Sequence, residues 1–273
     1  MIYLYAYTNH KENLDSLRRV ASIYATLKEH HIDAEILINE YRAQLLLKEW
    51  GYPLATTIET IKDIDAVASN EDIVLIDSNE NLEGKVLNYP NYFKKVIYIN
   101  SSFNKVKFDG ATIINTFLDK EFIFSNLKVN NRDKNNIYIF GDSDYNKTIL
   151  KNSEIFKNKN LDLYWGIYFF VKYEDKLLEI FNKIIDSEEY YKILIQYQNI
   201  ITSSLQTAIE AKANGANVEF LSINSLTKNE ANLLDYLEIK VANNINITNN
   251  KKLSNKKINN INNKLVDIIK SNM

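Results

Sequence analysis

Three features are absent or scarce in this 273-residue sequence, and each narrows the classes of protein to consider. There is no cysteine, which excludes disulfide bonds, zinc–thiolate sites and cysteine nucleophiles. Glycine and proline occur only 6 and 2 times, so the position of a glycine is informative. The longest apolar runs, such as LYWGIYFFV at 163–171, fall far short of the ~20 residues of a membrane-spanning helix. We therefore expect no transmembrane segment.

An excess of charge of one sign is also lacking. The chain carries 33 basic and 35 acidic residues, which gives a net charge of −2. This balance offers no electrostatic case for a nucleic-acid partner or an anionic membrane surface. The opening MIYLYAYTNH has no basic segment before its apolar residues and no small-residue cleavage site after them. We therefore expect no signal peptide and a cytoplasmic location, and the sequence points to no particular protein partner.

Strand and helix patterns alternate along the chain. Continuous apolar runs such as IVLI at 73–76 are typical of parallel strands buried on both faces, and 17–30 has the 3.6-residue apolar spacing of a helix. Further strands are expected at 2–8, 34–38, 96–99, 112–114, 137–140, 161–164, 199–202 and 218–221, and further helices at 43–50, 58–68, 173–185 and 187–197. The alternation predicts an α/β fold with parallel sheets and right-handed crossovers.

A polar stretch, KVNNRDKNN at 128–136, interrupts this alternation, which restarts at Ile137. We therefore predict two Rossmann-like domains with parallel sheets, at 1–127 and 137–248, joined by this linker and facing each other across a cleft. Residues 249–273 are predicted to be a polar linker and a closing helix at about 253–271 that returns towards the first domain. Sheets of this kind bind ligands beyond the carboxyl ends of their strands. That rule selects the loops at 8–16, 77–83, 141–145 and 202–207.

The last of these loops opens the stretch ITSSLQTAIEAKANG at 201–215. It supplies hydroxyls and backbone N–H groups at the start of a predicted helix, where the helix dipole favours an anion. Glu210 lies two turns from Ser203, so both can face the same edge of the cleft. The candidate ligand-binding residues here are Thr202, Ser203, Ser204, Thr207 and Glu210. A purely structural interpretation stays open: a serine N-cap, a solvated Glu210 and a helix stop at Gly215.

With these elements placed, about residues 1–245 resemble the two-domain GT-B glycosyltransferases. The chain is most similar to the short spore-coat-polysaccharide branch, which includes the nucleotide-sugar hydrolase of pseudaminic acid synthesis. Many GT-B enzymes have Ser/Thr-rich residues, then Glu-Ala, a Gly after three further residues, and a short strand. ITSSLQTAIEAKANGANVEFL matches this pattern, with Asn217 where a proline is common. The resemblance implies that the helix start receives the phosphates of a nucleotide sugar and that Glu210 holds the ribose hydroxyls.

The first domain matches the family less well. The family has a glycine-rich loop, then Gly-His, two residues and an Arg that opens a helix. In NHKENLDSLRR at 9–19, Arg19 fits that Arg, and Ser16 stands where the catalytic histidine would be. The resemblance implies substrate binding by Asn9, Ser16 and Arg19, and leaves His10, or Asp15 as a fallback, as general base. The alternatives are a surface histidine, an N-cap at Asp15 or Ser16, and a surface ion pair for Arg19.

The start of the second domain matches in part. The family often has Gly-Gly-Thr/Ser-Asp after a strand, and IYIFGDSD at 137–144 matches at Gly141, Ser143 and Asp144. Gly141 and Ser143 are therefore implied substrate-binding residues. The alternative is a tight turn with aspartate caps, and two acids would repel a diphosphate. The aromatic residues at 164–170 are expected in the core, with a base-stacking platform as the alternative.

Two hypotheses of function follow. The first is a nucleotide-sugar-dependent enzyme of surface polysaccharide or glycan biosynthesis, which transfers the sugar or hydrolyses its bond to the diphosphate, with no cofactor and no metal. The second is a catalytically silent relative that binds a sugar nucleotide or a protein partner. The Glu-Ala-xxx-Gly helix supports the first, whereas loss of the glycine-rich loop and the motif histidine supports the second.

Overall fold

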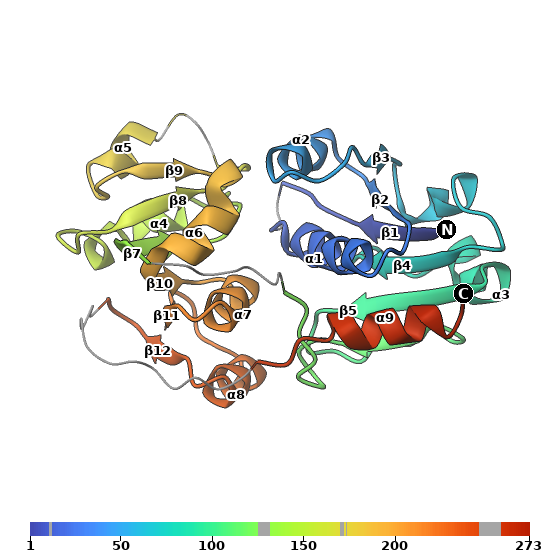
Figure 1. The fold of residues 1–273 in the computed structure, drawn as a ribbon. Helices are drawn as coiled ribbons and strands as arrows, with labels where there is room; N and C mark the ends of the chain where they lie inside the picture. The colour runs from blue at the N-terminus through green and yellow to red at the C-terminus, as the bar shows by residue number, and fades with distance from the viewer. Residues whose placement is uncertain (11–12, 125–131, 170–171, 173, 246–257) are drawn as a thin grey trace. The chain divides into compact units, whose positions relative to one another are not determined.

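The computed structural model describes residues 1–10, 13–124, 132–169, 172, 174–245 and 258–273, which form two compact units (Figure 1). The first unit comprises Met1–Asn9, Leu14–Ser125 and Asn259–Met273, and the second comprises His10–Asn13 and Asn126–Ile258. Each unit is built on its own six-stranded sheet, and the strands of both sheets are parallel. The predicted α/β class with two Rossmann-like parallel sheets is therefore confirmed.

The two sheets share one strand order. The first runs β3-β2-β1-β4-β5-β6, with bounds β1 (Ile2–Ala6), β2 (Ala34–Ile38), β3 (Thr56–Thr57), β4 (Ile73–Asp77), β5 (Lys95–Asn100) and β6 (Thr112–Asn115). The second runs β12-β11-β10-β7-β8-β9, with bounds β7 (Lys134–Ile139), β8 (Asp162–Trp165), β9 (Ile184–Asp186), β10 (Tyr197–Thr202), β11 (Asn217–Leu221) and β12 (Lys240–Ala242). Both follow the doubly wound pattern, whose order reverses between β1 and β4 in one unit and between β7 and β10 in the other.

Helices connect the strands. The first unit contains α1 (Asp15–Glu29), α2 (Tyr41–Glu49), η1 (Ile61–Ala66), η2 (Gly84–Asn88), α3 (Tyr89–Tyr92) and α9 (Asn262–Lys270). The second contains α4 (Thr148–Lys151), η3 (Ser153–Ile155), α5 (Glu174–Leu178), η5 (Ser187–Glu189), α6 (Tyr190–Gln196), α7 (Leu205–Ala213) and α8 (Lys228–Tyr236). Within the part of the chain that the structure describes, no helix is both long and apolar enough to cross a membrane.

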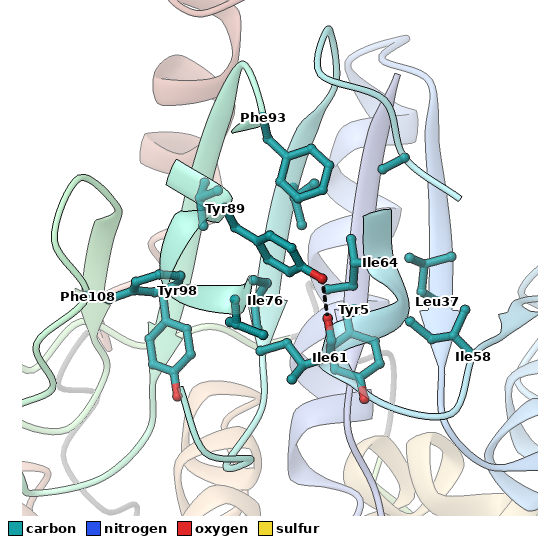
Figure 2. Packing of buried hydrophobic residues seen from close by; sticks show 14 residues of the cluster. Tyr5, Leu37, Ile58, Ile61, Ile64, Ile76, Tyr89, Phe93, Tyr98 and Phe108 are labelled. Atoms are coloured by element: carbon teal, nitrogen blue, oxygen red, sulfur yellow. Dashed lines mark hydrogen bonds between the residues drawn. The ribbon is translucent and has the colours of Figure 1, made fainter. Parts of the chain in front are cut away.

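The core of the first unit packs aromatic and branched side chains against its sheet (Figure 2). Tyr89 lies fully inside this cluster, and its hydroxyl donates to the backbone carbonyls of Ile61, at 3.1 Å, and Lys62, at 2.7 Å. A buried hydroxyl needs such partners because leaving it without one would cost ~1–3 kcal/mol. These bonds fix α3 against the short helix η1.

The carboxyl-terminal helix α9 packs on α1 within the first unit. The side-chain amide of Asn262 is buried and donates to the hydroxyls of Ser22, at 2.8 Å, and Thr26, at 3.0 Å. Leu265 and Ile269 are buried on the same helix. The helix begins at Asn262, later than the predicted 253, and 249–257 lie outside the described residues.

Several predicted elements differ from the structure. The predicted helix at 58–68 is the 3-10 helix η1, started by a capping box between Thr60 and Asp63. The predicted helix at 173–185 is wrong in its second half, because Ile184 pairs with Leu163 and the chain there forms β9. Sheet pairing overrides a local helical pattern when it buries the same apolar side chains. The predicted linker at 128–136 overlaps β7, which begins at Lys134, while 128–131 lie outside the described residues.

Candidate functional site

The carboxyl edge of the second sheet brings two of the predicted loops to one place. Strands β7 and β10 are neighbours on either side of the order reversal, with Ile139 paired to Thr202. The loop starting at Gly141 follows β7, and the segment that leads into α7 follows β10. In a doubly wound sheet this is the place where ligands bind.

The hydroxyls before α7 all have protein partners. Ser204 is the N-cap, and its hydroxyl accepts from the Thr207 amide at 3.2 Å. The Thr202 hydroxyl accepts from the Ser204 amide at 3.0 Å, and the Ser203 hydroxyl donates to the Leu221 carbonyl at 2.8 Å. The structural interpretation therefore accounts for these three side chains, and a ligand here would meet the backbone of the first helical turn.

Tyr138 completes the hydrogen bonding of Ser203. The two hydroxyl oxygens lie 2.9 Å apart, and the Ser203 proton already points to the Leu221 carbonyl, so Tyr138 is the donor. Burial raises the pKa of Tyr138 well above its usual range, which keeps this donor protonated. The hydrogen bond between Tyr138 and Ser203 therefore holds the residue that follows β10 against β7.

The end of α7 matches the prediction for Gly215. The helix ends at Ala213, and Gly215 has a φ of +80°. The Gly215 amide donates to the Lys212 carbonyl and the Ala216 amide to the Ala211 carbonyl, both at 3.0 Å. This pair of bonds is a Schellman stop, which needs a left-handed residue and therefore favours glycine.

Glu210 is not the solvated helix residue of the structural interpretation. Its side chain is only 2% exposed. One carboxylate oxygen accepts from the Tyr190 hydroxyl at 2.5 Å, and the other accepts from the side-chain amide of Gln206 at 2.9 Å. The Tyr190 hydroxyl also lies 3.3 Å from the Thr207 hydroxyl. Glu210 is thus held inside the unit by hydrogen bonds, as a buried carboxylate requires.

A second buried carboxylate lies at the same edge of the sheet. Asp142 has no exposed surface, and its side chain accepts from the Tyr164 hydroxyl at 2.8 Å. The rings of Tyr164 and Tyr190 meet edge to face with centroids 5.6 Å apart. Two tyrosines therefore connect the carboxylate of the β7 loop to that of α7. We call Asp142, Tyr164, Tyr190 and Glu210 the buried acid–tyrosine network.

The remaining residues of the β7 loop shape the backbone. Asp144 is buried and accepts from the amides of Thr148, at 2.6 Å, and Ile149, at 3.0 Å, as the aspartate-cap interpretation predicted. Gly141 has a φ of +147°, and a Cβ there would lie 2.5 Å from the Asn13 side-chain oxygen. That oxygen also accepts from the Asp142 amide at 2.9 Å. The positive φ, which L side chains rarely adopt, favours glycine here, and a Cβ would also displace the Asn13 side chain from its bond to Asp142.

His10 groups with the second unit. Its backbone carbonyl accepts from the Ser143 hydroxyl at 2.8 Å, and its exposed ring lies 6.3 Å from that of Tyr145. His10 and Ser143 are therefore brought together, but through the backbone of His10. Asn9, the residue before it, is half-buried.

The order reversal of the first unit carries an ion pair. Arg19 is 4% exposed, and two of its nitrogens bind the two carboxylate oxygens of Asp77 at 2.7 and 2.8 Å. The Ser101 hydroxyl lies 3.1 Å from the same guanidinium. The surface ion pair considered for Arg19 is therefore wrong in its location, because this pair is buried at the end of β4.

Ser16 and Asp15 lie in the first turn of α1. The Ser16 hydroxyl donates to the Tyr7 carbonyl at 2.5 Å, and Asp15 pairs with Arg18 at 3.1 Å. The N-cap position is Leu14, whose side chain cannot cap, so the predicted cap at Asp15 or Ser16 is wrong. Across the described ranges, no group of three or more His, Asp and Glu side chains is placed to hold a metal ion.

No family model and no curated protein matches the sequence. Solved structures match along almost the whole chain. UDP-GlcNAc 2-epimerase from Neisseria meningitidis, bound to UDP-GlcNAc, has a TM-score of 0.54 at 11% identity, over 99% of this chain and 100% of that one. The S. aureus MnaA–UDP co-structure has a TM-score of 0.57 at 10% identity, over 99% and 96%. The Methanocaldococcus jannaschii UDP-GlcNAc 2-epimerase, in complex with UDP-GlcNAc and UDP, has a TM-score of 0.52 at 13% identity, over 99% and 100%. At these identities the likeness is one of fold, and the fold of this chain is GT-B-like.

Proposed function

We propose that the chain binds a nucleoside-diphosphate sugar at the carboxyl edge of the second sheet, with the diphosphate against the first turn of α7. The observation that carries the proposal is the position of α7, which begins beside the reversal between β7 and β10. The N-terminal end of a helix favours anions through its dipole and its backbone N–H groups. The amide of Leu205, at the first helical position, has no acceptor among the described residues, so it is available to a phosphate.

The proposed reaction is transfer of the sugar or hydrolysis of its bond to the diphosphate, in surface polysaccharide or glycan biosynthesis. Support comes from the fold, since two of the matching structures hold UDP-GlcNAc and two hold UDP. Within this proposal the spore-coat and pseudaminic-acid hydrolase branch, suggested by the length and the motifs, is the finer hypothesis. Product analysis separates these reactions from epimerisation, in which the nucleotide sugar changes configuration but keeps its diphosphate.

We assign the proposed roles by how exposed each side chain is and by whether it already has a partner in the protein. His10 is exposed, whereas Asp15 is paired with Arg18, so His10 is the better candidate general base. We propose Asn9, Gly141 and Ser143 as substrate contacts near it.

Three other candidates are engaged within the protein. Arg19 and Ser16 are bound to Asp77 and to the Tyr7 carbonyl, so we propose that they act by holding the loop after β1 rather than by direct contact. Glu210 is proposed to reach ribose hydroxyls if Tyr190 gives up its hydrogen bond.

The first experiment is a thermal-shift screen over UDP, ADP, GDP and CDP sugars, followed by product analysis for each nucleotide sugar that binds.

The phosphate site is tested with two matched variants, Leu205→Pro and Leu205→Ala. Proline is tolerated at the first helical position and removes the N–H, and Ser204 before it already has the extended backbone that proline requires (φ −101°, ψ 125°). We expect Leu205→Pro to weaken binding by about tenfold to a hundredfold, because a hydrogen bond to a charged group is lost. Leu205→Ala keeps the N–H and should bind like the wild type, and equal affinities of the two variants would refute the phosphate site.

A catalytically silent relative is the second candidate, and one observation favours it. Ser16, which stands at the position of the family histidine, donates its proton to a backbone carbonyl and cannot serve as a base. Binding without turnover of any nucleotide sugar would establish this alternative. If turnover is found, His10→Ala should reduce it by ~10²–10⁴-fold, and activity within a few-fold of the wild type would remove His10 from the mechanism.

A further inference from the structure

A row of asparagines crosses the amino-terminal side of the second sheet. Asn136 of β7, Asn199 of β10 and Asn217 of β11 occupy one register position on three neighbouring strands. The Asn217 amide donates to the Asn199 side-chain oxygen at 3.0 Å, and the Asn199 amide donates to the Asn136 oxygen at 2.8 Å. We call these three residues the asparagine ladder.

The ladder lines part of a cavity of about 240 Å³. The cavity is lined by Asn135, Asn136, Asn160, Gln198, Asn199 and Asn217. These residues lie at or just before the beginnings of their strands, whereas the loops of the proposed nucleotide site follow the strand ends. In parallel strands these are opposite edges of the sheet, so the cavity is separate from that site.

The lining fixes the chemistry of a ligand. All six side chains are neutral carboxamides, so the cavity supplies no side-chain charge to pair with an anion or a cation. Each carboxamide has two N–H donors and an oxygen with two lone pairs. The ladder bonds use one donor of Asn199 and one acceptor position of the same side chain, which leaves a donor and an acceptor position on that residue. Elsewhere in the lining, Asn136 and Gln198 donate to the backbone carbonyls of Asn160 and Arg132, and the Asn160 side-chain oxygen accepts from Asn182. A ligand that matches must therefore donate and accept hydrogen bonds without carrying charge.

We propose that this cavity binds a neutral carbohydrate through its ring hydroxyls. A hydroxyl donates one hydrogen bond and accepts two, which complements a carboxamide. The cavity is slightly smaller than the ~300–1,000 Å³ of pockets for drug-sized ligands, so it suits one sugar ring of a longer glycan. A second sugar site on the same chain would hold a glycan acceptor or product away from the reacting centre.

The test is an NMR titration of the full chain with D-glucose, N-acetyl-D-glucosamine and maltotriose. The readout is the set of side-chain amide signals of Asn136, Asn199 and Asn217. At least one of these sugars should shift them saturably at millimolar concentration. The affinity should be unchanged between ~0.05 and ~0.5 M NaCl, since a neutral contact is not screened by salt. The backbone signals of α7 should not move, which separates this outcome from that of the nucleotide proposal.

Two variants and one control test whether the sugar binds in this cavity. Asn199→Ala removes the centre of the ladder, and Asn135→Ala removes an exposed lining carboxamide that lies outside the ladder, so it leaves folding intact. Each should weaken sugar binding by about threefold to tenfold, the effect of one neutral hydrogen bond. Asn232→Ala, on the exposed face of α8, should bind as the wild type. Absence of saturable shifts with all three sugars overturns the proposal. Wild-type affinity in both single variants, Asn135→Ala and Asn199→Ala, also overturns it, because the ladder would then have only a structural role.

Discussion

The two units reverse their strand order in the same way, but the side chains at the two reversals differ. In the first unit, Arg19 and Asp77 form a buried ion pair with two hydrogen bonds. In the second, the reversal carries the capped start of α7 and the buried acid–tyrosine network. One topology thus supports two chemistries, so a site must be argued from its residues rather than from the fold.

The difference also indicates which unit should take the phosphates. The Arg19 guanidinium is already neutralised by a bidentate carboxylate, and removing it from Asp77 would leave a buried charge unpaired. The start of α7 instead offers a backbone donor, the amide of Leu205, and binding there breaks no side-chain pair.

Each unit has one tryptophan, Trp50 in the first and Trp165 in the second. Replacing one of them by phenylalanine makes fluorescence report the unfolding of a single unit.

The largest effect is expected for Arg19→Met, measured by urea unfolding in a Trp165→Phe background. Loss of the guanidinium leaves the Asp77 carboxylate buried without its partner, which should lower the free energy of unfolding of the first unit by ~3–5 kcal/mol. The control is the double variant Arg19→Met/Asp77→Leu, which should recover much of the loss because no buried charge is left. A loss below ~1 kcal/mol in the single variant would mean that the ion pair is not what holds this reversal together.

A smaller effect is expected for Glu210→Ala, measured in a Trp50→Phe background. The Tyr190 hydroxyl and the Gln206 amide lose their carboxylate acceptor inside the second unit, which should cost about 1–3 kcal/mol. Glu210→Gln keeps one acceptor oxygen and should cost less. An unchanged unfolding curve for Glu210→Ala would show that the network contributes nothing to stability and would favour a purely ligand-binding role.

Alkaline pH should destabilise the first unit through Tyr98. Burial, with Asp77 and Glu80 nearby, raises the pKa of Tyr98 to about 12 from a usual value of 10.0. The unfolded state therefore loses this proton first, and the stability that Tyr98 contributes is present below pH 10 and falls as the pH rises towards 12. Between pH 10 and 11 the loss should be about 1 kcal/mol. Urea unfolding of wild type and Tyr98→Phe across this range isolates the contribution of Tyr98, and an equal pH dependence of the free energy of unfolding in the two proteins would contradict it.

The smallest effect on stability is expected for Ser204→Ala, which tests whether the Ser204 hydroxyl is a helix cap or a ligand contact. Because its hydroxyl caps α7, Ser204→Ala should destabilise the second unit by about 1 kcal/mol. Affinity for UDP should change by less than about threefold, since the proposed phosphate contact is a backbone amide. Ser204→Gly is the control, because glycine is tolerated as an N-cap and should cost only a few tenths of a kcal/mol. A large loss of affinity with unchanged stability would make the Ser204 hydroxyl itself a ligand.

The sequence was sufficient for features that depend on neighbours along the chain. The apolar run at 73–76 became a buried strand, and Ser204 and Gly215 bracket α7 as an N-cap and a helix stop. Cap and stop residues act over three or four positions, so their spacing is visible in a sequence.

Features that depend on distant residues were missed. Arg19 and Asp77 are 58 positions apart, and Tyr164 and Asp142 are 22 apart, so only the packing of the sheet joins them. Glu210 was expected in solvent or at a ligand, because no local pattern points to Tyr190. Tyr164 was expected in the core, where it lies, but its hydroxyl contact could not be anticipated. Asp142 was expected in a tight turn with aspartate caps, and its burial, which makes a hydrogen-bond partner necessary, is a finding of the structure.

The most direct test of the nucleotide proposal is an NMR titration of the full chain with UDP and with the other nucleoside diphosphates. The backbone amide signals of Leu205 and Gln206 report on α7 in the second unit. The backbone amide signal of Ala21, in α1, is followed with them as the reporter for the first unit. We expect one nucleotide to shift the two α7 signals saturably, to leave Ala21 unmoved, and to lose about tenfold or more in affinity in Leu205→Pro. Saturable binding that moves Ala21 while the α7 signals stay fixed, or binding that Leu205→Pro does not weaken, would contradict the proposal.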